Sequence, residues 1–192
     1  ITTGEGGAIV TDSKENYEKL KLIRSHGRLE TRDYFSSTEY MNYVTLGYNF
    51  RMSNLTAVLG LSQLRKVDKL VEMRRKNAKY MTEELKQVKE VTAPSPPKNY
   101  YHVYQMYTIR VDANSRDKLM KYLANKGIMT KVHFYPVHLT HFYKNELNYN
   151  CKLPVTEEIS KQVLTLPMYP SLTMEEIDYM VGEIKAFFSR SA

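Results

Sequence analysis

The 192-residue sequence predicts an α/β protein. Helix-like runs, in which apolar residues recur every three or four positions, alternate with short apolar segments typical of strands. After the prolines near residue 95 the expected order is strand, helix, strand, helix, short strand and helix, which is typical of helices covering a sheet. Hydrophobic residues make up 42% of the chain and charged residues 26%, as in an average globular protein.

The first predicted elements are a turn, a strand and a helix. The glycine-rich turn Thr3–Gly7 leads into Ala8–Thr11, a short apolar run of strand character. This turn is a poor phosphate cradle, because phosphate loops usually follow a strand and open a helix. Asp12–Ser13 is predicted to start a helix that ends at Gly27. Residues 28–45 are predicted to form a long irregular loop, which in a compact domain is usually functional.

One long helix is predicted to begin at Ser53 and to run unbroken to about Val88. Its apolar residues recur at three- and four-residue steps and form a single stripe. A helix of this length typically connects two lobes or lines a subunit contact. The proline-rich stretch Ala93–Asn99 follows it and marks a boundary.

The residues after this boundary predict a smaller α/β lobe. Thr173 and Glu176 have the spacing of a capping box, which places the start of the last helix. The expected elements are a strand at 103–111, a helix from Ser115 to Gly127, a strand at 128–135, a helix at 153–164, an extended piece at 165–170 and a helix from Thr173 to Phe188.

The loop before the long helix is the candidate anion site. Gly47 permits a turn that bulkier residues resist, Asn49 offers an amide, and Arg51 offers a planar fork of donors. These residues come just before a predicted helix start, where free backbone N–H groups already favour an anion. The alternative is a loop in which Asn49 caps its own backbone and Arg51 pairs with a surface acid.

Four of the five histidines follow the proline boundary. His138 and His141 are close in sequence, but no carboxylate lies at ligand spacing, so we expect no metal site. A polar surface of His and Tyr side chains for a small molecule is the favoured interpretation. The single cysteine, Cys151, excludes an internal disulfide and fits a reducing compartment.

The formal net charge of +7 raises nucleic acid as a partner. The lysines are instead spread among glutamates along helical patterns, as in residues 14–19, which indicates solvated helix faces. No apolar run approaches the roughly 20 residues of a membrane-spanning helix, so no membrane partner is expected.

Several ordered motifs resemble the DegT/StrS sugar aminotransferases, and the likeness covers essentially the whole chain. They are Thr2–Gly7, Arg24–Gly27, Gly47–Met52, Leu59–Leu64, Val132–Leu139 and Leu166–Pro170. The resemblance implies a pyridoxal 5′-phosphate enzyme that moves an amino group from glutamate to a keto sugar carried on a nucleotide. Perosamine synthases and spore-coat polysaccharide enzymes are typical of the family.

The resemblance also implies the aspartate-aminotransferase-type fold, with a large and a small α/β domain. Residues 1–53 are then the end of the large domain, 54–92 a connecting helix and 93–192 the small domain. The family works as a homodimer, in which Asn49 corresponds to a residue that reaches the neighbour's cofactor phosphate; Arg51 is a second cofactor contact. His133, Tyr135 and His138 correspond to positions lining the substrate entrance.

The catalytic lysine of the family, which forms the Schiff base with the cofactor, lies just upstream of the motif at Thr2–Gly7. Since this chain begins within that motif, we expect it to be the C-terminal half of a cytoplasmic enzyme and inactive alone. Three alternatives are a non-catalytic binding or assembly module, a basic nucleic-acid-binding protein, and a relative with flavin or dehydration chemistry.

Overall fold

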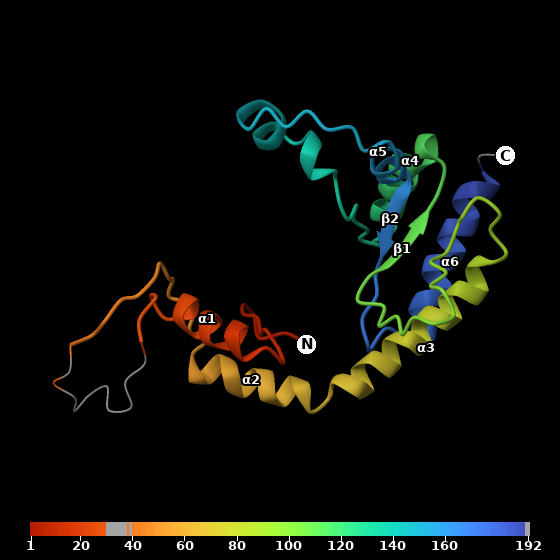
Figure 1. Ribbon diagram of the computed structural model, residues 1–192. Coiled ribbons are helices and arrows are strands. Elements are labelled where there is room, and N and C mark those ends of the chain that lie inside the picture. The colour runs from red at the N-terminus through yellow and green to blue at the C-terminus, as the bar shows by residue number, and fades with distance from the viewer. Residues whose placement is uncertain (30–37, 39, 191–192) are drawn as a thin grey trace. The chain divides into compact units, whose positions relative to one another are not determined.

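The computed structural model describes residues 1–29, 38 and 40–190, which divide into unit 1 (Ile1–Val67) and unit 2 (Asp68–Ala192). The elements of these residues are labelled in Figure 1 where space allows. Unit 1 contains α1 (Lys14–Arg24), α2 (Asn54–Leu64) and the first residue of α3 (Val67–Leu85). Unit 2 contains the rest of α3, then β1 (Tyr107–Arg110), α4 (Ala113–Asn125), a 3-10 turn η1 (Val137–Leu139), a π-helical turn η2 (Phe142–Glu146), α5 (Pro154–Gln162), β2 (Val163–Leu166) and α6 (Met174–Ser189).

Unit 1 is built on two helices that bury none of their own residues. The predicted caps are confirmed, because Ser13 accepts a hydrogen bond from Asn16 N–H and Ser53 accepts one from Thr56 N–H. The predicted strand at residues 8–11 is wrong. No described segment pairs with it, and Val10 is 94% exposed, because a strand forms only where a second strand supplies its hydrogen bonds. Of the predicted loop 28–45, residues 30–37 and 39 lie outside the described residues.

The expectation of one unbroken helix from residue 53 to 88 is also wrong. Helix α2 ends at Leu64 and α3 begins at Val67. Between them the Lys66 N–H donates to the carbonyl of Gln63, three residues back, which is a tighter turn than the α-helix makes. The three- and four-residue spacing of apolar residues continues across this turn, so the sequence pattern does not reveal it.

The sheet of unit 2 pairs β1 with β2 antiparallel, from Tyr107 opposite Leu166 to Arg110 opposite Val163. Single bridges extend it on both sides, from Thr92 to Arg110 and from Lys131 to Thr165. The predicted strand at 128–135 is therefore reduced to one bridge at Lys131. The predicted helix 153–164 stops at Gln162, because Val163 and Leu164 are buried in β2.

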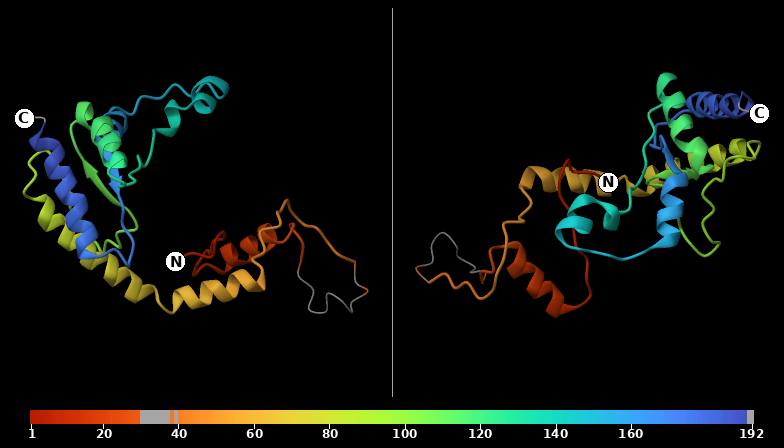
Figure 2. Two further views of the ribbon diagram at one scale, coloured as in Figure 1. Left: turned by 180° about the vertical axis from the view of Figure 1, so that it is seen from behind. Right: turned by 90° about the horizontal axis from the view of Figure 1, so that it is seen from above.

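Helices α3, α4 and α6 supply most of the core of unit 2 around the two strands. Figures 1 and 2 show α3 beside α6, and Tyr80 of α3 donates to the Asp178 carboxylate of α6 at 2.7 Å. The fully buried core residues include Met81, Leu85, Tyr107, Ile109, Leu119, Leu123, Leu164, Ile177 and Ile184. This burial is the main source of stability for unit 2.

Local capping fixes two helix starts in unit 2. The predicted capping box is confirmed: Thr173 N–H donates to Glu176 Oε2 at 2.8 Å, and Glu176 N–H donates to Thr173 Oγ1 at 3.2 Å. The predicted cap at Ser115 is wrong, since Asp112 accepts from Asn114 N–H and α4 starts at Ala113.

No helix among the described residues is long and apolar enough to cross a membrane.

Candidate functional site

The segment around Asn49 is held against the end of α1 by backbone hydrogen bonds. Tyr48 N–H donates to the carbonyl of Ile23 at 2.7 Å, and Phe50 N–H donates to that of Arg24 at 2.9 Å. In return, His26 N–H donates to the carbonyl of Tyr48 at 2.9 Å. Two motifs singled out in the sequence, Arg24–Gly27 and Gly47–Met52, therefore form one structural element.

Two glycines make this close approach possible. Gly27 has φ +72°, and a Cβ there would lie 1.7 Å from the carbonyl oxygen of Thr45. A Cβ on Gly47 would lie 2.0 Å from the backbone nitrogen of Gly27. Any side chain at either position would separate the two backbones.

Alternate side chains of residues 48–51 lie together, so that Tyr48 pairs with Phe50 and Asn49 pairs with Arg51. The rings of Tyr48 and Phe50 stack with centroids 4.9 Å apart and planes at 8°. Arg51 Nε donates to Asn49 Oδ1 at 3.0 Å, so these two side chains also lie together. Asn49 Nδ2 and the two terminal nitrogens of Arg51 make no hydrogen bond to the described part of the chain, and both side chains are exposed. The pair offers donors from two side chains to one ligand.

The start of α2 adds a favourable field close to this pair. Ser53 caps the helix two residues after Arg51, and its hydroxyl accepts from Thr56 N–H at 3.2 Å. The first turn of α2 carries no acidic residue, so no carboxylate offsets the positive end of the helix dipole. The donor set and this field suit a phosphate or carboxylate.

A cavity of about 1430 Å³ lies beside the pair within unit 1. Tyr17, Leu20 and Ile23 of α1 contribute to its wall. Three cationic residues line it against a single acid, Glu5. The lining residues are Glu5–Thr11, Tyr17, Leu20, Lys21, Ile23, Arg24, Phe50–Ser53 and Thr56. The cavity therefore combines apolar walls with an excess of positive charge.

The three residues predicted to line a substrate entrance lie in unit 2 and differ in exposure. Tyr135 is 62% exposed. His133 has a buried Nδ1 with no hydrogen-bond partner in the described structure, and its ring packs edge-on against Phe134. His138 is only 7% exposed, and its Nε2 lies 3.1 Å from Glu157 Oε1. Their role in substrate binding remains a prediction.

Glu157 is the residue that the sequence did not identify. It stands four residues after Leu153, the N-cap residue of α5, whose side chain makes no capping hydrogen bond. A carboxylate in the first turn after a proline is a recognisable helix-start pattern, but nothing local links it to His138.

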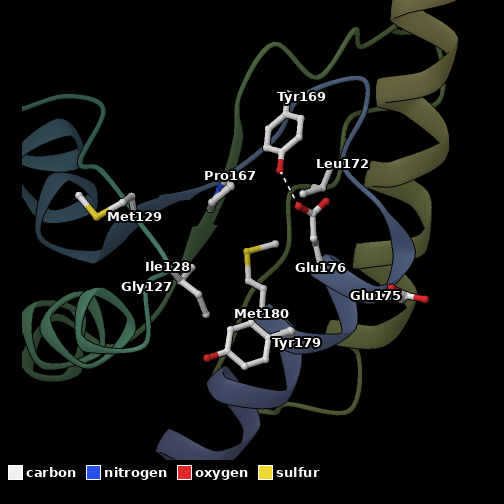
Figure 3. Close-up of a pocket in the computed structure, with 10 residues that line it drawn as sticks. All are labelled: Gly127, Ile128, Met129, Pro167, Tyr169, Leu172, Glu175, Glu176, Tyr179 and Met180. Carbon is white, nitrogen blue, oxygen red and sulfur yellow. Dashed lines mark hydrogen bonds between the residues drawn. The ribbon is translucent and has the colours of Figure 1, made fainter.

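A second, smaller hollow of about 590 Å³ in unit 2 is shown in Figure 3. Tyr169 donates to Glu176 Oε1 at 3.2 Å, and the other oxygen of Glu176 is used by the capping box. The pKa of Tyr169 is raised, first by burial and then by the nearby Glu176 charge. Glu175 points away from the other side chains of the hollow. The carboxylate of Glu176, at the centre of the hollow, is thus used for hydrogen bonds that hold the structure. The described residues contain no group of three metal ligands.

The sequence of this chain is similar to those of known aminotransferases. The family described as DegT/DnrJ/EryC1/StrS aminotransferases matches residues 1–185. The GDP-perosamine synthase of Escherichia coli O157:H7 is 33% identical over 98% of the chain and 49% of that enzyme. The UDP-4-amino-4,6-dideoxy-N-acetyl-beta-L-altrosamine transaminase of Campylobacter jejuni is 30% identical over 94% of the chain and 47% of that enzyme.

The fold is that of solved sugar aminotransferases. The structure of Helicobacter pylori PseC, an aminotransferase involved in the biosynthesis of pseudoaminic acid, matches with a TM-score of 0.89 and 27% identity. That match covers 99% of this chain and 50% of PseC. The chain thus spans about half the length of the relatives it matches, and the predicted aminotransferase-type fold is confirmed over that half.

Proposed function

Because the chain belongs to the DegT/DnrJ/EryC1/StrS aminotransferase family, we propose that it is part of a sugar aminotransferase. The complete enzyme moves an amino group from glutamate to a nucleotide-linked keto sugar for cell-surface polysaccharide synthesis. The observation that carries this proposal is the pair Asn49 and Arg51, two exposed side chains that bond to each other just before the start of α2. Since its substrates are nucleotide-linked sugars and glutamate, we place the enzyme in the cytoplasm.

Asn49 and Arg51 fit the phosphate of pyridoxal 5′-phosphate. The Asn49 Oδ1 orients the Arg51 guanidinium by accepting from its Nε. The Asn49 amide would hold the phosphate with a neutral donor, and Arg51 would add charge-assisted donors. The cofactor, when bound, supplies the carbonyl and the electron-withdrawing ring that amino transfer requires. The role of these two residues is to bind and orient it.

His133, Tyr135 and His138 form the substrate entrance in this proposal. The exposed phenol of Tyr135 is suited to sugar hydroxyl or phosphate groups. His138 acts differently, because its buried ring is bonded to Glu157 and so holds the end of this segment against α5. Residues 1–53 complete the large domain, 54–92 connect the domains, and 93–192 form the small domain.

The complete enzyme works as a homodimer, in which Asn49 serves the cofactor of the neighbouring subunit. The surface of α2 supports association, since it is apolar on most sides and Leu55, Leu59 and Leu64 are 82%, 56% and 57% exposed. A helix that is apolar all round is normally buried. The 192 residues alone do not transaminate, because no lysine among them matches the family's catalytic lysine.

Calorimetric titration with pyridoxal phosphate tests the assignment of Asn49 and Arg51. We expect Arg51→Gln to weaken binding by about 10-fold or more, as for the loss of a charge-assisted hydrogen bond. Lys66→Gln is the matched control, because it removes the same charge from an exposed site and should leave binding within about twofold. The titration is made on the complete enzyme, since the proposal places the rest of the cofactor site outside these residues, and equal effects of both changes would contradict the assignment.

Incubation with glutamate and a nucleotide-linked keto sugar tests the rest of the proposal. The chain alone should form no 2-oxoglutarate. Formation of 2-oxoglutarate, or cofactor fixed to one of its lysines by borohydride, would contradict the expected inactivity. Tight, steeply salt-dependent binding of DNA or RNA would instead favour a nucleic-acid-binding protein.

A further inference from the structure

Residues 139–152 form an arm that leaves the body of unit 2 after His138 and returns at Leu153. It is the teal segment that projects at the top of Figure 1. Every residue from 141 to 150 is exposed, so the arm has no buried side chain along this length. The hydrogen bonds of residues 139–152, among the described residues, all join partners between 136 and 149. Neither a core nor hydrogen bonds from within the arm attach it to the sheet and helices.

The two ends of the arm meet at one carboxylate oxygen. Glu157 Oε1 accepts a hydrogen bond from the backbone N–H of Leu153 at 2.9 Å, and His138 Nε2 lies 3.1 Å from the same oxygen. His138 stands immediately before the arm and Leu153 immediately after it. The side chain of His138 is 8% exposed and that of Glu157 is 33% exposed, so the contact is shielded from water on the side of the imidazole.

The placement of Glu157 in the first turn of α5 strengthens both contacts. Leu153 has no side-chain group that could cap this helix. The Glu157 carboxylate instead accepts from the Leu153 N–H, as the acidic residue of a capping box does. The same N–H, and then His138, lower the pKa of Glu157, so the carboxylate stays charged at neutral pH. It also lies near the positive end of the helix dipole.

We propose that Glu157 is a positioning residue that closes the base of the arm and thereby fixes the direction of His133–His138. This inference rests on the proposed function in one respect: that function assigns His133–His138 to the substrate entrance. With the base closed, the turn at Pro136–Thr140 is held in one orientation. With it open, the arm and the entrance segment move together.

Limited trypsin digestion of the full chain tests the closed base, because Lys144 and Lys152 lie within the arm. We expect Glu157→Ala to increase the rate of cleavage after these lysines by about 10-fold, in line with the loss of two hydrogen bonds to a partly exposed carboxylate. Glu157→Gln should restore near-normal rates, since its amide oxygen accepts the same two bonds. Glu158→Ala is the matched control, because its carboxylate bonds only within α5.

Amide hydrogen exchange gives the second measurement and confirms that each variant is folded. Leu139 and Thr140 N–H donate to the carbonyls of Pro136 and Val137, so their exchange should accelerate in Glu157→Ala and in His138→Ala, and no further in the double variant. The amides of Tyr107–Arg110 should stay protected. Unchanged cleavage and exchange in a folded Glu157→Ala chain would overturn the proposal. Neither measurement depends on amino transfer, so failure of the proposed function would leave these results unaltered.

Discussion

The side-chain amide of Asn77 donates to the carbonyl oxygen of Leu172 across 3.1 Å, which joins α3 to the turn before α6. The same Nδ2 atom lies 3.2 Å from the carbonyl of Tyr169 and 3.3 Å from that of Pro170. Arg74, one helical turn earlier, donates to the carbonyl of Met168 at 2.8 Å. Two polar side chains of α3 thus hold the backbone of residues 168–172 through its carbonyls.

Replacing Asn77 by Leu should lower the free energy of unfolding of unit 2 by about 1–3 kcal/mol, because buried carbonyls lose their donor. Urea unfolding followed by circular dichroism measures this change. Lys76→Leu is the control, since Lys76 is exposed on the same helix. An equal loss of stability in both variants would show that the Asn77 hydrogen bonds contribute nothing specific.

Gly27→Ala should detach the segment around Asn49 from α1. Gly127→Ala is a matched control, because its φ of +76° is close to the +72° of Gly27, while a Cβ there meets nothing within 4 Å. Both changes carry the strain of a left-handed alanine, about 1–2 kcal/mol, but only Gly27→Ala adds a clash with the Thr45 carbonyl. We expect the amides of Tyr48 and Phe50 to lose protection from hydrogen exchange in Gly27→Ala alone. Retained protection of these two amides would contradict the steric role of Gly27.

The stability of unit 2 should fall as pH rises from about 10 to about 12. Burial raises the pKa of Tyr107 from 10.0 to about 12, although its hydrogen bond with Thr82 acts in the opposite direction. The folded state therefore holds this proton more tightly than the unfolded state. Its contribution to stability is present below the unfolded pKa and is lost as pH approaches the folded value.

Unfolding measured across this pH range, compared with Tyr107→Phe, checks the alkaline prediction. The Phe variant lacks the titrating group and should show a smaller loss of stability between these limits. Identical pH dependence in the two proteins would mean that Tyr107 does not titrate with a raised pKa.

Asp112→Ala should destabilise α4 by about 1 kcal/mol, since Asp112 caps the helix by accepting from Asn114 N–H at 2.9 Å. Ser115→Ala should change stability by less than about 0.5 kcal/mol, because its hydroxyl caps nothing in the structure. Thermal unfolding distinguishes the two positions. A larger loss of stability in Ser115→Ala than in Asp112→Ala would show that Ser115 caps α4, as the sequence predicted.

Local chemistry explains which elements the sequence predicted correctly. Ser13, Ser53 and the Thr173–Glu176 box cap their helices as expected, because a cap needs only residues within one turn. Residues 8–11 and 163–164 were assigned wrongly because strand formation depends on residues elsewhere in the chain. An apolar run becomes a strand only where a partner strand lies beside it, and β2 has one whereas residues 8–11 have none among the described residues.

The sequence by itself determined the α/β class, the family and the helix starts that follow Ser13, Ser53 and Thr173, because these depend on periodicity, ordered motifs and capping. Only the tertiary structure decided that Gly47 lies against Gly27, that Asn49 and Arg51 bond to each other beside α2, and that Glu157 joins His138 to Leu153. Two of these contacts, Asn49 with Arg51 and Leu153 with Glu157, join residues close in sequence. The other two, Gly27 with Gly47 and His138 with Glu157, join residues far apart in the chain. Backbone pairing and burial select these distant contacts, and no local pattern of residues carries that information.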